Sequence, residues 1–298
     1  MASLKEVRSR ITSVSSTQQI TKAMKMVSAA KLRRAQDSIL RMRPYAQRLG
    51  GILTNLSTLT EGAVTNAFSQ EREINRVLLI VVTSDRGLAG AFNSNIIKAV
   101  TTLITGKYSR QFAAGNVTFL TIGKKGYDTL RKRGGYNIIN DYTNTFASLS
   151  FDAVRAAAEH AMDAFLNNEF DRVDIVYNEF KNVATQIIRT EQFLPIEEKA
   201  PAERNGSAAL IADYTFEPSK EEIIRELIPK SLKIQVYKAV LESKASEEGA
   251  RMTAMDKATD NAGELLKQLK LTYNRTRQAA ITKEILEIVG GAEALASQ

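Results

Sequence analysis

Two stretches of the chain, one at each end, place apolar residues at alternating spacings of three and four. This heptad spacing is typical of a helix that supercoils against another helix. Both stretches attach to the same central region, so their inner ends meet there, and we predict a long antiparallel coiled coil. The expected seam residues are Leu4, Val7, Ile11, Val14, Leu32, Ala35, Ile39, Met42, Ala46, Leu49, Leu53 and Leu56, and then Ile234, Leu241, Ala245, Met252, Met255, Thr259, Ala262, Leu266, Leu269, Tyr273, Thr276 and Ala280.

The seam of the first stretch becomes polar part-way along. The register there reads Gln18, Thr21, Lys25 and Ser28, whereas the apolar residues move to another face at Ile20, Ala23, Met24 and Val27. Polar seam positions lower the stability of a helix pair. We therefore predict that pairing weakens in this segment and that the first helix changes partners.

Each stretch also contains a proline, which lacks a backbone N–H and clashes with the preceding helical turn. We expect a local kink near Pro44. Pro229 is expected to divide a short lead-in helix, capped by Ser219, from the long helix that starts near Lys230.

The end of the second stretch has no partner left within the chain, because the second helix is expected to be the longer one. Its apolar residues cover much of the helix circumference at Ile281, Ile285, Leu286, Ile288, Val289, Ala292, Ala294 and Leu295. An exposed apolar surface of this kind marks an interaction site. We predict that other proteins surround this end; the alternative is a frayed tail with scattered apolar residues.

The central region alternates strands and helices, which predicts a Rossmann-like α/β domain with a mostly parallel sheet. The resulting domains are residues 1–60 (first coiled-coil helix), 61–218 (α/β domain) and 219–298 (second coiled-coil helix). Expected strands cover residues 77–82, 117–122 and 173–177, with edge strands at 185–193 and 213–216; expected helices cover 93–105, 124–133 and 151–168, and a loop covers 197–207.

Charge and composition exclude several classes of site. The chain has a net charge of +8, and the segment before residue 60 exceeds this surplus alone, which points to an acidic partner for the first helix. There is no cysteine, so disulfides and zinc–thiolate sites are excluded. His160 is the only histidine, which removes histidine-pair metal sites. No apolar run reaches the length of a membrane-spanning helix.

The junction after the first expected strand resembles a nucleotide-binding turn only superficially. It offers Gly87 and Gly90, whereas a dinucleotide fingerprint needs three glycines at fixed spacing. Gly123-Lys124 lacks the earlier glycine of a phosphate loop. We interpret Gly87 and Gly90 as turn residues, and we predict no catalytic residue, cofactor or metal site. Two alternatives stay open: a nucleotide-dependent enzyme built on the α/β domain, and a coiled-coil protein associated with nucleic acid.

Five segments together resemble the gamma subunits of F-type ATP synthases, in family order and over the whole chain. The sequence Gln-Ile-Thr-Lys-Ala-Met-Lys-Met-Val-Ser-Ala-Ala-Lys at residues 19–31 is similar to the N-terminal signature of that family. Ser-Asp-Arg-Gly-Leu-Ala-Gly-Ala-Phe-Asn at residues 84–93 is similar to its strand–turn–helix motif. The remaining segments are residues 251–255, 271–284 and 287–295.

The resemblance implies a non-catalytic shaft at the cytoplasmic face of a bacterial inner membrane, peripheral and without a transmembrane segment. Its implied partners are the alpha and beta subunits, the epsilon subunit and the membrane c-ring, with no nucleic acid. Residues implied to contact beta are Lys22, Met24, Lys25, Arg251, Arg277, Gln278, Thr282 and Glu284, and those implied to sit in an apolar bearing are Ile285, Ile288, Val289 and Leu295.

Overall fold

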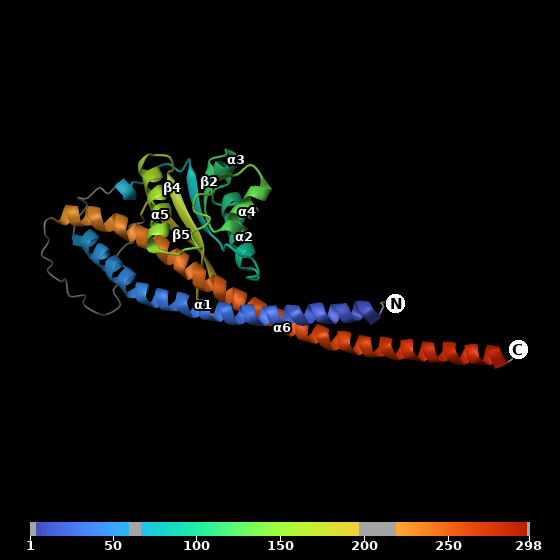
Figure 1. Cartoon of the computed structure of the whole chain (residues 1–298). Coiled ribbons are helices and arrows are strands. Elements are labelled where there is room, and N and C mark those ends of the chain that lie inside the picture. Colours follow the sequence, from blue (N-terminus) through green and yellow to red (C-terminus); the bar gives the residue numbers. More distant parts are fainter. Residues whose placement is uncertain (1–3, 60–66, 197–218, 297–298) are drawn as a thin grey trace. The chain divides into compact units, whose positions relative to one another are not determined.

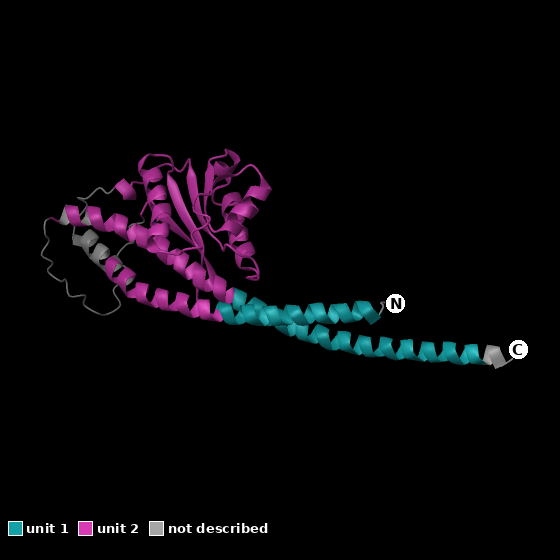
Figure 2. Cartoon of the chain, in the orientation of Figure 1, with its two compact units in different colours: residues 1–28, 251–298 teal, residues 29–250 magenta. Residues whose placement is uncertain are grey.

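The computed structural model describes residues 4–59, 67–196 and 219–296. The chain forms two compact units, shown in Figure 2: unit 1 comprises residues 1–28 and 251–298, and unit 2 comprises residues 29–250. The expected loop at 197–207 and the expected edge strand at 213–216 lie outside the described residues.

Unit 2 contains a five-stranded sheet in the order β3-β2-β1-β4-β5. All neighbouring pairs are parallel except β4 with β5, so the predicted mostly parallel, Rossmann-like sheet is confirmed. The four longer strands lie where the apolar runs predicted them, whereas the short β3 was not predicted. The strands are β1 (Val77–Val82), β2 (Val117–Ile122), β3 (Asn137–Ile139), β4 (Arg172–Phe180) and β5 (Gln186–Leu194).

Helices cover both faces of this sheet (Figure 1). Every residue of β1 is buried, because its two faces enter two separate hydrophobic clusters. On one face pack α2 (Phe92–Thr105), α3 (Ser109–Ala113) and α4 (Lys124–Arg133). On the other face pack the short 3-10 helix η1 (Ala67–Ser69), α5 (Phe151–Leu166) and the first part of α6 (Lys220–Ala296).

Two long helices, α1 (Leu4–Leu59) and α6, begin and end close to the predicted positions. The Ser219 hydroxyl accepts a hydrogen bond from the Glu222 amide at 3.2 Å, which confirms the predicted cap. The predicted division at Pro229 is wrong, since α6 runs through it without interruption. A proline removes one intrahelical hydrogen bond, and the neighbouring Ile228 and Leu232 hold this part of α6 on the hydrophobic cluster of the sheet.

Within unit 1, α1 and α6 pair in antiparallel orientation. Thr259 donates a hydrogen bond to the Thr21 hydroxyl at 2.8 Å, and Lys25 binds Asp256 at 2.5 Å. A step of four residues forward along α1 therefore moves the contact three residues backward along α6. The predicted antiparallel coiled coil is confirmed by this reversal.

The paired part of α6 ends where the heptad count ends. Seam positions up to Ala280 stay buried or half-buried, whereas every residue from 281 to 292 is exposed. The predicted unpaired, apolar end of the second helix is thus present in unit 1. We call residues 281–292 the apolar tip.

Candidate partner-binding surfaces

Residues in the polar part of the α1 seam contact α6. Thr21 and Ser28 are buried, and Thr21 is hydrogen-bonded to α6. The two helices therefore stay in contact through the segment where weaker pairing was predicted. Threonine and serine satisfy each other or the backbone by hydrogen bonds, so that the two helices approach closely without large apolar side chains. The Gln18 side chain lies over Gly263, where a Cβ would be 3.0 Å from its Nε2 atom.

The apolar residues displaced from this seam form an uncovered stripe on α1. Ile20, Met26 and Val27 are each more than half exposed. Sequence reasoning found Ile20 and Val27 from the shifted register but missed Met26. Large apolar side chains gathered on one side of an exposed helix indicate a docking face.

The three predicted contact residues of α1 differ in their surroundings. Lys22 is exposed and has no ion-pair partner among the described residues. Met24 is half-buried, beside the seam. Lys25 is partly exposed, and its ammonium is bound to Asp256. The charge of Lys22 is therefore open to solvent, whereas the charge of Lys25 is used within the helix pair.

The predicted contact residues of α6 fall into an exposed and a buried set. Arg277, Gln278, Thr282 and Glu284 are all exposed, and the Thr282 hydroxyl donates to the Gln278 carbonyl at 3.0 Å. Arg251 is only 7% exposed and has contacts within the chain. Little of the Arg251 side chain is thus left for another protein.

The apolar tip gathers five large exposed aliphatic side chains within twelve residues of α6. Ile285, Ile288 and Val289 are exposed by 54%, 71% and 48%, and Ile281 and Leu286 lie among them. The side chain of the fourth predicted bearing residue, Leu295, lies outside the described residues. No described residue of unit 1 covers this tip, which leaves it open to another protein.

The place where Rossmann-like sheets bind ligands is filled by the chain itself. Such sheets bind ligands beyond the carboxyl ends of the strands, at the point where the strand order reverses, which here lies between β1 and β4. In unit 2 the Ser246 hydroxyl of α6 donates to the Asn178 carbonyl near the end of β4. Glu242 and Glu247 of α6 are also buried there. This crevice holds a helix, which argues against a nucleotide site.

The loop after β1 closes the other side of the crevice. The Ser84 amide donates to the Asn93 side chain at 3.0 Å, which ties the loop to α2. Gly90 has φ of 57°, so it supplies the left-handed turn expected of it. Gly87 has an ordinary φ, and a Cβ there would lie 3.9 Å from Lys125. The close backbone approach belongs to Gly123, the residue after β2, which was not predicted.

Burial raises the pKa of Asp85 in this loop, against a lowering hydrogen bond from the Lys124 amide; the charge of Glu247 raises it further. A raised pKa means that the ionised carboxyl destabilises the folded state above the pKa of the unfolded chain. We therefore expect Asp85→Asn to increase the thermal unfolding temperature at pH 7. The gain should shrink as the pH falls and disappear once Asp85 is protonated in both folded and unfolded chains. A gain that stays constant down to pH 3 would contradict this electrostatic origin.

No group of three or more metal-ligating side chains occurs among the described residues. Within the same residues, no helix is both long and apolar enough to cross a membrane. The most buried acidic group of the sheet, Asp174, is neutralised internally: Lys107, Tyr108 and Arg172 all bind it. These charges serve the fold and offer no reactive constellation.

The fold and these surfaces define a class of protein: a Rossmann-like domain placed in sequence between two long pairing helices, with an uncovered stripe and an uncovered helical tip for partners. The family model described as ATP synthase matches residues 3–295. The ATP synthase gamma chain of Cytophaga hutchinsonii is 64% identical over 295 residues, covering 99% of both chains. That of Flavobacterium johnsoniae is 57% identical over 296 residues, again covering 99% of both. The chain belongs to the ATP synthase gamma chain family.

Solved structures share this fold at lower sequence identity. A chain of the Euglena gracilis mitochondrial ATP synthase, in a structure of OSCP, F1 and c-ring, aligns with a TM-score of 0.65 at 22% identity; the match covers 98% of this chain and 94% of that one. A chain of the Tetrahymena thermophila mitochondrial ATP synthase, in a structure of the central stalk and c-ring, aligns with a TM-score of 0.58 at 24% identity, covering 80% and 99%.

Proposed function

We propose that this chain is the rotating shaft of a proton-translocating F-type ATP synthase. As a member of the gamma chain family it is a subunit of an ATP synthase. In the proposed mechanism, proton flow turns the membrane c-ring and the chain turns with it. Its asymmetric helix pair then presents a different face to each beta subunit, which biases that subunit between conformations.

The observation that carries this proposal is the apolar tip, which continues α6 beyond the last seam residue, Ala280, with every residue exposed. An exposed apolar helix end of this kind marks an interaction site for other proteins. A ring of alternating alpha and beta subunits would supply that surrounding. We assign Ile285, Ile288, Val289 and Leu295 to the bearing in that ring.

The remaining assignments divide the chain by role. Residues 1–60 and 219–298 form the shaft, and residues 61–218 form the foot that meets the epsilon subunit and the c-ring. We assign beta-subunit contacts to Lys22, Met24, Lys25, Arg277, Gln278, Thr282 and Glu284, and not to Arg251, which is buried. The chain has no catalytic site of its own in this proposal, binds no cofactor or nucleic acid, and lies peripherally at the cytoplasmic face of a bacterial inner membrane.

A single-molecule experiment tests the proposal directly. The chain has no cysteine, so Ser109→Cys on the exposed end of α3 gives one attachment point for a bead. Complexes immobilised through their alpha and beta subunits are then supplied with ATP. We expect stepwise rotation of the bead. Sustained ATP hydrolysis with a stationary bead would refute the shaft function.

Charge reversal at Lys22 is expected to weaken coupling. Lys22 is exposed without a partner among the described residues, so Lys22→Glu removes a charge that only another subunit would use. Exposed charge contacts contribute about 0.2–1 kcal/mol each. The rate of ATP-driven proton pumping relative to ATP hydrolysis should therefore fall by roughly two- to fivefold.

Lys25 needs a separate control, because its reversal also breaks the ion pair with Asp256. The double variant Lys25→Asp with Asp256→Lys retains an ion pair between the helices but reverses the charge at position 25. If it pumps as well as the unaltered chain while Lys22→Glu does not, the outward contact belongs to Lys22. Normal coupling in Lys22→Glu would remove Lys22 from the contact surface.

A further inference from the structure

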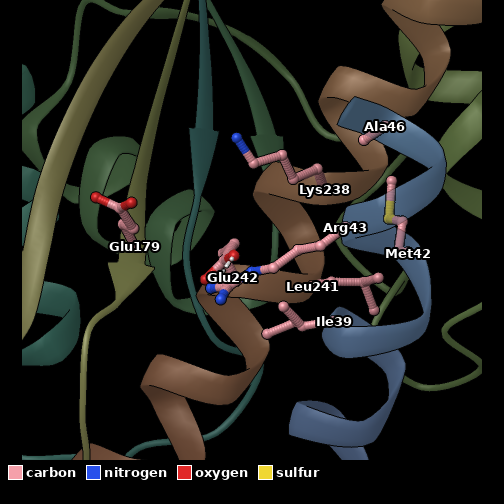
Figure 3. A pocket seen from close by; sticks show the side chains of 8 residues that line it. All are labelled: Ile39, Met42, Arg43, Ala46, Glu179, Lys238, Leu241 and Glu242. Carbon is pink, nitrogen blue, oxygen red and sulfur yellow. Dashed lines mark hydrogen bonds and ion pairs between the residues drawn. The ribbon is translucent and has the colours of Figure 1, made fainter. Parts of the chain in front are cut away.

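A buried glutamate in unit 2 joins α1, α6 and the sheet. Glu242 of α6 is 2% exposed. One of its carboxylate oxygens accepts a hydrogen bond from the Phe180 amide at the end of β4, at 3.1 Å. The other binds the Arg43 guanidinium of α1, also at 3.1 Å, as Figure 3 shows. We call this set of three residues the clasp.

The clasp lies beside a hollow of about 420 Å³ between α1, α6 and β4 (Figure 3). Arg43 reaches across from α1 and is 47% exposed, so water reaches its outer side. Glu179, the nearest other carboxylate on the wall, is bound to Arg189 at 2.6 Å. Lys238 on the same wall is exposed and has no ion pair among the described residues. Arg43 is thus the cation that neutralises Glu242.

Burial makes the two contacts of Glu242 depend on each other. A buried carboxylate is tolerated only when a cation and hydrogen-bond donors compensate it. If Arg43 is removed, Glu242 keeps only the Phe180 amide, and the charge is left largely uncompensated. Removing Glu242 leaves the amide at the end of β4 without its acceptor. Breaking one contact therefore loosens the other.

Two neighbouring side chains, one on α1 and one on α6, make contacts of a different kind. Ile39 of α1 and Leu241 of α6 line the same hollow and are buried apolar side chains. Apolar burial is non-directional, so such surfaces resist separation more than sliding or twisting. Hydrogen bonds and ion pairs have preferred distances and angles. In this part of unit 2, the clasp supplies directional contacts to both helices at once.

We propose that the clasp of Arg43, Glu242 and Phe180 is the contact through which the α/β domain passes torque to both helices. The proposal rests on the proposed shaft function. A torque applied to the sheet reaches α6 through the carboxylate at Phe180 and reaches α1 through the guanidinium. Arg43 and Glu242 are positioning residues in this role, since neither is placed near a catalytic site.

The test uses the assembled complex with the bead at Ser109→Cys, held at a dwell so that only its thermal angular spread is recorded. That spread measures the torsional stiffness between the α/β domain and the immobilised ring. Arg43→Met should widen the spread, which is a loss of stiffness. Arg43→Lys, which retains the cation, should restore part of it. Arg41→Met is the matched control, because Arg41 lies on the same helix and is exposed.

A second measurement isolates the contact within the chain. Hydrogen exchange of the Phe180 amide should accelerate about tenfold in Glu242→Gln, because a hydrogen bond to a charged acceptor is replaced by one to a neutral amide. If Glu242→Gln does not fold, the milder Arg43→Met should show a smaller acceleration at the same amide. Amides of β1 should keep their exchange rates.

Equal angular spread in Arg43→Met and Arg41→Met would overturn the proposal, even if Arg43→Met lowers thermal stability. The shaft function is refuted by a separate result: in a complex whose clasp is unaltered, the bead does not rotate when ATP is supplied. Angular spread at a dwell needs no rotation, so it still judges the clasp in that case.

Discussion

Aspartate at Ile285, Ile288 and Val289 together is expected to weaken assembly with the partner subunits by about a hundredfold or more. Each side chain is about half or more exposed in the chain alone and would be buried in a surrounding ring. Burying an aliphatic side chain contributes about 1.5–3 kcal/mol, and 1.4 kcal/mol is tenfold in affinity. Even partial burial of three such residues gives two or more powers of ten. Reconstitution with alpha and beta subunits, followed by sedimentation, measures the loss.

The same variant should leave the isolated chain folded, because residues 281–292 contact nothing that holds unit 1 together. Its circular dichroism should be unchanged and its tendency to aggregate reduced. Gly290→Asp with Gly291→Asp is the matched control: both positions open onto free space, so this pair adds charge to the tip without removing apolar surface. Equal assembly of the triple variant and this control would mean that the apolar tip binds no partner.

The tip was predictable because heptad counting needs only spacing. The alternating spacing of three and four continues without a break from Met252 to Ala280. From residue 281 to residue 292, every residue is exposed. The strands β1 and β2 were equally predictable, since six consecutive β-branched or apolar residues are typical of a strand covered on both faces. Patterns that repeat, or that persist over a whole helix or strand, therefore predicted the folded structure correctly.

Predictions from local sequence patterns failed where tertiary packing determines the structure. Pro229 carries a strong helix-breaking signal, yet α6 continues through it because its neighbours are held on the sheet. The polar residues Thr21 and Ser28 indicate a weak seam, yet both are buried, and Thr21 is hydrogen-bonded to Thr259 across the seam. The three-residue strand β3 has too few residues to show a period. None of these outcomes can be predicted without knowing which helix or strand packs against the residues concerned.

The clasp lay beyond sequence reasoning for a related reason. Glu242 falls in a run of polar residues on α6, and polar residues on a long helix are ordinarily assigned to a solvated face. Its burial depends on where β4 ends and on the register that brings Arg43 opposite. Both depend on the tertiary structure. The only hint in the sequence was that the α/β domain lacks a ligand motif at the point where its fold normally binds one.

Replacing Gly123 with alanine is expected to lower the thermal unfolding temperature by roughly 10 °C. Gly123 follows β2 with φ of 100°, a conformation that costs a residue with a side chain about 1–3 kcal/mol. A Cβ there would lie 2.1 Å from the Thr83 carbonyl oxygen, so the backbone after β1 would have to move as well. Overpacking of this kind costs about 1–3 kcal/mol more, and each kcal/mol shifts the midpoint of a domain of this size by about 2–4 °C.

Gly115→Ala separates these two causes. Gly115 has φ of 73° but opens onto free space, so alanine there suffers the backbone strain without the clash. It should lower the midpoint by about half as much, because the strain makes up about half of the expected cost. The difference measures the close approach of β2 to Thr83, the residue that starts the loop carrying Ser84 and Asp85. If the two variants unfold at the same temperature, the ends of β1 and β2 can separate freely, and the loop over the filled crevice is not held by this contact.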